Sequence, residues 1–178
     1  MALPALATAG ELAAWMQLTP DELPASASLV LDTVSAIVRA EARQHFTRRT
    51  TTVELQPRDG VVTLPQRPVV RVISVWSASA VLDPGGWRLF RDRLHVPAAT
   101  SLVEVVYEHG YTEVPGDVRA VVLTAASRVL NNPSDLRQET AGGVSVTYAA
   151  ETIGASLSPA DRDLLARYRR RVAVVDTA

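Results

Sequence analysis

The stretch Leu102–Pro133 reads LVEVVYEHGYTEVPGDVRAVVLTAASRVLNNP, and it decides the fold class that the sequence predicts. Leu102–Glu108 is mostly apolar and is expected to form a short strand. His109-Gly110 favours a turn, since glycine adopts backbone conformations that other residues avoid. A helical pattern follows, so the stretch predicts a strand that leads directly into a helix.

This helix has a predicted beginning, face and end. It is expected to begin at Pro115 or Asp117 and to stop at Asn131-Asn132-Pro133, because proline interrupts helical hydrogen bonding. Its predicted buried stripe consists of Val118, Val122, Ala125 and Val129. No residues in the stretch are arranged for catalysis, so it is expected to serve the packing of the fold.

Helices are also predicted near the N-terminus. Thr8 and Glu11 form a capping-box pattern at the start of the first helix. The residues expected on its apolar face are Leu12, Trp15 and Met16. Thr19-Pro20-Asp21-Glu22 predicts one further turn, which Pro24 ends.

The main N-terminal helix is predicted from about Ala25 to Arg43. Its apolar stripe consists of Ala27, Val30, Val34, Ile37 and Val38. Its solvated face is expected to consist of Ser28, Asp32, Ser35, Arg39 and Arg43. One stripe opposite one polar face is typical of a helix packed on a core.

Residues 49–111 are predicted to be rich in strands. Thr and Val dominate Arg49 to Gln56, and Asp59-Gly60 favours a hairpin turn between this strand and Val61–Leu64. Further strands are expected at Val69–Trp76, Trp87–Phe90, Leu94–Val96 and Leu102–Glu108. Prolines punctuate them, so several are expected to be edge strands.

The C-terminal part predicts a short strand, a helix and a tail. The strand VSVTY follows Gly142-Gly143, and the helix begins at Ser158-Pro159 with acidic residues in its first turn. The last turn is expected to hold Arg167, Arg169, Arg170 and Arg171, which suits the helix dipole. The tail, Val172-Ala173-Val174-Val175, is apolar and largely β-branched.

Together these elements predict an α+β fold in a single domain, residues 1–178. A bundle of three or four helices, from residues about 8–46 and 115–171, carries an inserted β-rich subdomain of residues 49–111 and a C-terminal tail of residues 172–178. Apolar residues make up 47% and charged residues 21%, as in ordinary soluble globular proteins. No apolar run approaches the ~18 residues of a membrane helix, and MALPALATAG does not predict a signal peptide.

No catalytic, metal or cofactor site is predicted. His45, His95 and His109 have no second ligand at metal-binding spacing, and the chain has no cysteine. These rings are expected to be exposed or partly buried. His109, Asp117 and Ser127 do not match the spacing of a hydrolase triad.

Two other features are expected to be structural. The pairs Gly85-Gly86 and Gly142-Gly143 lack the lysine and hydroxyl residue of a phosphate loop, so they favour turns. Trp15, Trp76 and Trp87 do not interleave with basic residues and are expected to pack in the core or in the subdomain.

The C-terminal arginines and tail leave two interpretations open. Arg167–Arg171 is either a solvated helix end or a contact with an acidic protein surface or DNA phosphates. The tail either folds back on its own domain or adds a strand to the sheet edge of a partner. In the second interpretation the partner-binding residues are Tyr168, Arg169, Arg170, Arg171, Val172, Val174 and Val175.

The order of elements resembles the head–tail connector, or adaptor, proteins of long-tailed double-stranded DNA bacteriophages. The matching segments are VVYEHGYTEVPGDVRAVVLTAASRVLNNP, ETAGGVSVTY and LSPADRDLLARYRRR. The likeness is strongest from Val103 to Arg171 and looser over Arg49–Arg93. There the chain departs from compact family members, which are largely helical with a single hairpin.

The resemblance implies a structural virion protein at the head–tail interface, present in the host cytoplasm during assembly. It would form a ring, expected to be a dodecamer, below the portal protein. Such a ring lengthens the DNA channel and docks the next stopper or tail-completion protein. In this family the C-terminal segment engages the portal, which corresponds here to Tyr168–Val175. The net charge of −1 is compatible with this role, because a strongly basic lumen would hold the phosphates of passing DNA.

Two alternatives are kept. The first is another neck or tail-completion protein of the same assembly, distinguished by whether it binds the portal or the tail tube. The second is a small hydrolase or ligand-binding enzyme domain, which would need a concave pocket with convergent polar groups and a titrating residue of perturbed pKa.

Overall fold

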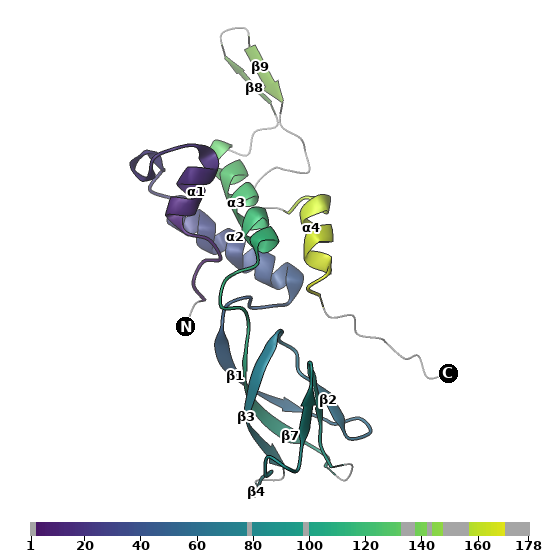
Figure 1. Cartoon of the computed structure of the whole chain (residues 1–178). Coiled ribbons are helices and arrows are strands. Elements are labelled where there is room, and N and C mark those ends of the chain that lie inside the picture. The colour runs from purple at the N-terminus through teal and green to yellow at the C-terminus, as the bar shows by residue number, and fades with distance from the viewer. Residues whose placement is uncertain are drawn as a thin grey trace, which may run out of the picture. The chain divides into compact units, whose positions relative to one another are not determined.

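The computed structural model describes residues 3–77, 80–97, 100–132, 138–141, 144–147 and 157–169. The chain divides into two compact units. The helical unit consists of Met1–Gln44 and Val114–Ala178, and the β unit consists of His45–Glu113. Helices and antiparallel sheets are both present, which confirms the mixed α+β class (Figure 1). The helical bundle with an inserted subdomain, as one domain, stays a prediction.

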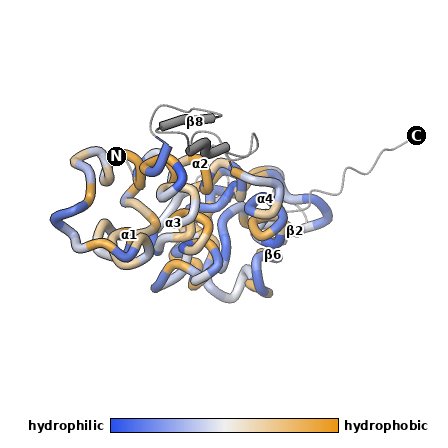
Figure 2. Tube along the Cα trace, turned by 90° about the horizontal axis from the view of Figure 1, so that it is seen from above, coloured by the Kyte–Doolittle hydropathy of each residue, from blue (hydrophilic) through white to orange (hydrophobic). Residues whose placement is uncertain are grey.

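The helical unit is built from short amphipathic helices. They are α1 (Ala9–Met16), η1 (Pro20–Glu22), α2 (Ala27–Ala42), α3 (Gly116–Asn131) and α4 (Pro159–Ala166). α2 packs against α3, α1 contacts both, and α4 also contacts α2 and α3. Hydrophobic residues recur along these helices between hydrophilic ones (Figure 2). No helix in the described part of the chain is long and apolar enough to cross a membrane.

The predicted starts and faces of these helices are largely confirmed. Thr8 and Glu11 form the capping box of α1, and Thr19 and Glu22 form another at η1. On α3 the predicted residues Val118, Val122 and Ala125 are fully buried, while Val129 is half-buried. A hairpin of β8 (Gln138–Ala141) and β9 (Val144–Thr147) follows α3 in the sequence. Strand β9 was predicted and β8 was not.

The predicted polar face of α2 is wrong at two positions. Ser35 and Arg39 are buried, because the chain ahead of α1 packs back over this side of the helix. The Leu6 amide donates to Ser35 Oγ at 2.9 Å, and the Arg39 guanidinium donates to the Pro4 carbonyl oxygen at 2.5 Å. Helical periodicity cannot show that a separate segment will cover a polar face.

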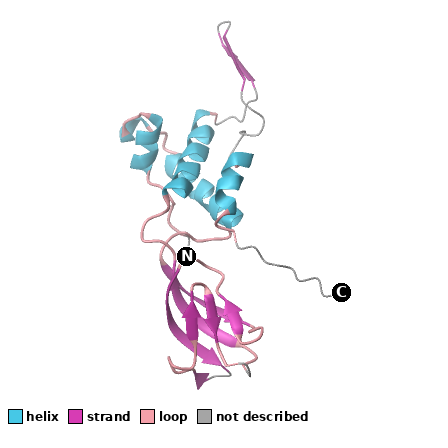
Figure 3. Ribbon diagram, turned by 45° about the vertical axis from the view of Figure 1, so that its right-hand side comes forward, coloured by secondary structure: helices cyan, strands magenta, loops and turns pink. Residues whose placement is uncertain are grey.

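The described residues of the β unit form strands and loops (Figure 3). One sheet has the order β1-β7-β3-β4, and the other has the order β2-β6-β5, all pairs antiparallel. The bounds are β1 (Arg49–Leu55), β2 (Val61–Thr63), β3 (Val69–Ser77), β4 (Ala80–Val81), β5 (Arg88–Phe90), β6 (Arg93–His95) and β7 (Val103–His109). Apart from the two-residue β4, each of these strands was predicted.

The two sheets share one hydrophobic core. Its members are Val62, Leu64, Val75, Leu94, Val96, Val103, Val105 and Tyr107. In β7 burial alternates from residue to residue, since every odd-numbered residue from Val103 to His109 is buried. Core-facing side chains of the two sheets therefore point toward each other, and the side chains on the opposite face of each sheet point away from the core.

The predicted hairpin between β1 and β2 is wrong, although its turn is present. Asp59 and Gly60 have φ of 52° and 71°, and Arg58 and Val61 exchange two backbone hydrogen bonds of 2.9 Å. These positive values are typical of a tight hairpin turn. Beyond that single bridge the strands separate, because β1 pairs with β7 and β2 pairs with β6.

The tryptophans do not all pack in cores. Trp87 packs against the core of the β unit, as predicted. Trp15 and Trp76 are 50% and 39% exposed, so core packing is the wrong prediction for them.

Candidate functional site

The candidate interaction site begins where α4 ends. α4 stops at Ala166, so Arg167 and Arg169 lie beyond the helix and not in its last turn, which corrects the prediction. The backbone tightens there, since the Tyr168 amide donates to the Leu165 carbonyl and the Arg169 amide to the Ala166 carbonyl. The other predicted partner-binding residues, Arg170, Arg171, Val172, Val174 and Val175, lie outside the described residues.

Asp117 holds Arg167 and Tyr168. The Tyr168 hydroxyl donates to Asp117 Oδ1 at 2.8 Å, and the Arg167 guanidinium forms an ion pair with the same carboxylate. Burial raises the pKa of Asp117, but the hydrogen bonds from Arg167 and Tyr168 outweigh it, and the net pKa is lowered. Asp117 also lies in the first turn of α3, where the helix dipole favours a negative charge.

Glu41 holds Arg169 in a similar way. Arg169 Nε donates to the Glu41 carbonyl oxygen at 2.7 Å, and its guanidinium pairs with the Glu41 carboxylate. Glu41 lies in the last turn of α2, whose C-terminus favours a cation. Tyr168 and Arg169 are therefore bound to α3 and α2.

Asp161 attaches α4 to α3. Its Oδ2 accepts from Arg128 Nη2 at 2.6 Å and from the Ser158 amide at 2.9 Å. Burial raises the pKa of Asp161, but hydrogen bonds from Arg128 and Ser158 outweigh it, and the net pKa is lowered. One carboxylate thus caps its own helix and neutralises a largely buried arginine of another.

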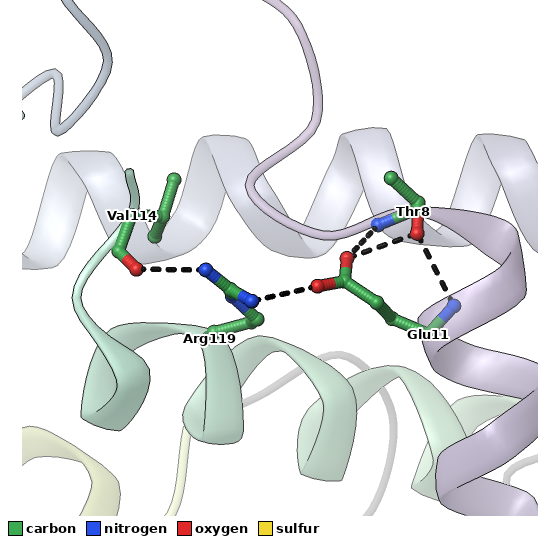
Figure 4. Close-up of polar contacts among 4 residues, drawn as sticks. All are labelled: Thr8, Glu11, Val114 and Arg119. Carbon is green, nitrogen blue, oxygen red and sulfur yellow. Dashed lines mark hydrogen bonds and ion pairs between the residues drawn. The ribbon is translucent and has the colours of Figure 1, made fainter. Parts of the chain in front are cut away.

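Arg119 connects α3 to the N-terminus of α1 (Figure 4). Its guanidinium donates to Glu11 Oε1 at 2.8 Å and to the Val114 carbonyl oxygen at 3.1 Å. The other oxygen of Glu11 accepts from the Thr8 amide at 2.7 Å. The Thr8 hydrogen bonds and the nearby Arg119 lower the pKa of Glu11, so the capping box also serves as an anchor between helices.

The three residues considered as a hydrolase triad are engaged elsewhere. The Thr51 hydroxyl is 2.9 Å from His109 Nε2, and Asp117 binds Arg167 and Tyr168. The Ser127 hydroxyl donates to the Thr124 carbonyl oxygen at 2.9 Å. Within the described ranges, no group of three or more His, Cys, Asp or Glu residues could hold a metal ion.

His109 is fully buried, which the sequence analysis did not predict. Its ring lies 5.2 Å from the ring of Tyr107 and 5.4 Å from that of His45. Burial, helped by the nearby charges of His45 and Arg49, lowers the pKa of His109 from 6.5 to about 4. The ring is therefore a neutral part of the β unit at neutral pH.

This shift predicts acid sensitivity. Below pH 6.5 the His109 ring of the unfolded chain is protonated, whereas in the folded chain it stays neutral until the pH approaches 4. Since the unfolded state then binds more protons, the free energy of unfolding should fall by roughly 3 kcal/mol over that interval. Urea denaturation from pH 7 to 4 measures it. His109→Gln should have a shallower slope than wild type, and His95→Gln, at an exposed site, should match wild type. Equal slopes for all three would contradict the assignment.

The acceptors of this site were not predicted from the sequence. Each acceptor is a carboxylate that lies at least 33 residues away in the chain from the side chain it binds. The pairs are Asp117 with Tyr168, Glu41 with Arg169, and Asp161 with Arg128. Only Asp161 carried a local signal, since it lies three residues after Ser158 in a capping pattern. The other two carboxylates could not be paired from sequence spacing.

Comparison with solved structures finds similar folds. One is a chain from the neck of a native GTA particle computed with C12 symmetry, with 20% identity, 97% coverage of both chains and a TM-score of 0.56. Another is from the neck of an empty GTA particle computed with C6 symmetry, at 19% identity, 97% and 94% coverage and a TM-score of 0.61. A third is from the virion of a native gene transfer agent particle, at 21% identity, 94% and 91% coverage and a TM-score of 0.60.

No protein-family model and no curated protein matches the chain. At about 20% identity, the likeness to these structures shows the fold. It extends over nearly the full length of both chains, so it includes the helical unit and the β unit together.

Proposed function

We propose that this chain is a structural protein of the neck of a tailed phage-like particle. The observation that carries the proposal is the likeness over nearly the whole of both chains to chains of gene transfer agent necks and virions. Those necks were computed with C12 and C6 symmetry, which supports a subunit that associates with copies of itself in a ring. Its proposed location is the virion, reached after assembly in the host cytoplasm.

Within the neck we propose the head–tail adaptor role. The ring, proposed as a dodecamer, would lie below the portal, extend the DNA channel and dock a stopper or tail-completion protein. DNA would pass without sequence-specific binding, in keeping with the net charge of −1. The role uses no cofactor, no metal and no catalytic residue, and it involves no membrane.

The anchored C-terminal end supports a portal contact. Asp117 and Glu41 hold Tyr168 and Arg169, so the arginines and valines that follow start from a defined position. A short extended segment that starts from a fixed point loses less entropy on binding than a fully free one. We propose that residues 168–175 form the portal contact, with the valines adding a strand to a sheet edge of the partner.

Deletion of residues 172–178 should abolish binding to the portal protein of the same genome without lowering the Tm. The backbone of Val172–Val175 would supply the hydrogen bonds of the added strand, whereas the anchors at Asp117 and Glu41 remain. Light scattering with and without purified portal measures binding, and calorimetry measures the Tm.

Deletion of residues 176–178 alone is the matched control and should leave binding intact. Unchanged binding after deletion of 172–178 would refute the tail contact but not the neck role. Wild-type protein that ignores the portal but binds the tail tube would favour another neck or tail-completion protein. Hydrolytic activity lost in a His109→Gln or Ser127→Ala variant would favour the enzyme alternative.

A further inference from the structure

The outer face of the three-stranded sheet is basic and aromatic. Leu94 points to the core, and the residues that alternate with the core-facing positions are exposed. Register places Arg88 opposite His95 and Phe90 opposite Arg93, so all four lie on one side. We call this set, Arg88, Phe90, Arg93 and His95, the basic face.

The charges of the basic face are not neutralised. Phe90 is 63% exposed, and the guanidinium of Arg91 lies 5.6 Å from the centre of its ring. Asp92, in the same turn, is 3.9 Å from Arg67. Neither Arg88 nor Arg93 has a carboxylate partner among the residues that the structure describes.

The outer face of the four-stranded sheet carries a row of acidic and apolar residues. Glu54 lies opposite Glu104, Glu104 opposite Trp76, and Trp76 opposite Val81. This row, the acidic face, crosses β1, β7, β3 and β4. Trp76 and Val81 are 39% and 54% exposed.

The acidic face is unfavourable in an isolated chain. Two carboxylates directly opposite each other repel, and no cation pairs with Glu54 or Glu104 in the described residues. Glu108, further along the same face, is different, since Arg48 and Arg71 each bind it at 2.7 Å. Hydrogen bonds from Arg71 and Arg48 lower its pKa. Glu54 and Glu104 thus remain available for an external cation.

We propose that the acidic face of one copy binds the basic face of a second copy of this chain. Two arginines can meet two carboxylates, and a guanidinium can bind a carboxylate through two parallel hydrogen bonds. Trp76 and Phe90 are the aromatic anchors of the two sides. Because the faces differ and lie on opposite sides of one core, the contact is head-to-tail and closes into a ring if its rotation allows. The inference rests on the proposed ring subunit and names the surfaces that join its copies.

Charge reversal tests the pairing. Glu54→Arg/Glu104→Arg has two basic faces, and Arg88→Glu/Arg93→Glu has two acidic faces. Each double variant alone should self-associate about 100-fold more weakly than wild type, because like charges then meet. An equimolar mixture of the two should regain association. The quadruple variant, with wild-type net charge and exchanged faces, should associate as wild type does.

Sedimentation velocity up to 1 mM protein at two salt concentrations measures each sample, and higher salt should weaken every association.

Arg58→Glu and Asp83→Arg are the matched controls, since both residues are exposed in the same unit and neither belongs to the two faces as defined. Each should behave as wild type. Double variants that associate as wild type does would overturn the pairing while leaving the proposed neck role intact. Wild type and mixture that both remain monomeric would also overturn it, and the portal-binding measurement would then decide the neck role separately.

Discussion

Gly110→Ala is expected to lower the free energy of unfolding by at least about 4 kcal/mol. Gly110 has φ of +94°, which is unfavourable for alanine, and an added Cβ would overlap the Thr47 carbonyl oxygen and lie 2.7 Å from its carbon. That backbone cannot easily move. The Tyr111 amide donates to the Phe46 carbonyl at 3.0 Å, and the Gly110 amide donates to the Pro68 carbonyl at 2.9 Å. A shift of either segment would break these bonds at the end of β7.

Gly85→Ala is the matched control. A Cβ at Gly85 meets nothing within 4 Å, so its effect should stay within about 1 kcal/mol of zero. Urea denaturation followed by tryptophan fluorescence measures both variants, since Trp76 and Trp87 lie in the β unit. Equal stability of the two variants would show that the Thr47 backbone can yield.

Asp161→Ala is expected to lower the free energy of unfolding by about 3 kcal/mol and to release α4 from the rest of the helical unit. The substitution removes the acceptor of Arg128 Nη2 at 2.6 Å and of the Ser158 amide at 2.9 Å. Arg128 would keep its charge in a site where its Nε is already buried without a hydrogen-bond partner among the described residues. Loss of the helix cap adds to the cost of that unpaired charge.

Hydrogen exchange of the α4 amides measures the release directly. Exchange there should accelerate in Asp161→Ala more than in α2 or α3, because α4 is short and depends on this contact. Asp163→Ala, an exposed position in the same helix, is the control and should leave exchange and Tm nearly unchanged. Protection of α4 that is equal in both variants would contradict the role of Asp161.

Local patterns predicted most of the elements. The capping-box pattern at Thr8 and the Ser158-Pro159 start mark the beginnings of α1 and α4, and the predicted strand Leu102–Glu108 is confirmed by β7. These signals succeed because helix starts and short strands depend on residues within a few positions of one another. The Asp59-Gly60 turn was found for the same reason, although the strands that it joins belong to different sheets.

The candidate interaction site was predicted in part. Tyr168 and Arg169 were named, but their acceptors Asp117 and Glu41 were not, because these pairs are separated by 51 and 128 residues. The acidic face was not predicted either. Glu54, Glu104, Trp76 and Val81 come from four strands, and only their register brings them into one row.

The α+β class, the strand that leads into α3 and the ends of several helices follow from the sequence, since each depends on neighbouring residues alone. Which polar residues are buried, which strands pair and which carboxylates meet arginines depends on the tertiary structure. Ser35 and Arg39 are buried because a distant segment covers them, and Glu54 faces Glu104 because β1 pairs with β7 and not with β2. Contacts between distant segments depend on the whole chain closing around its cores, and no local pattern encodes them.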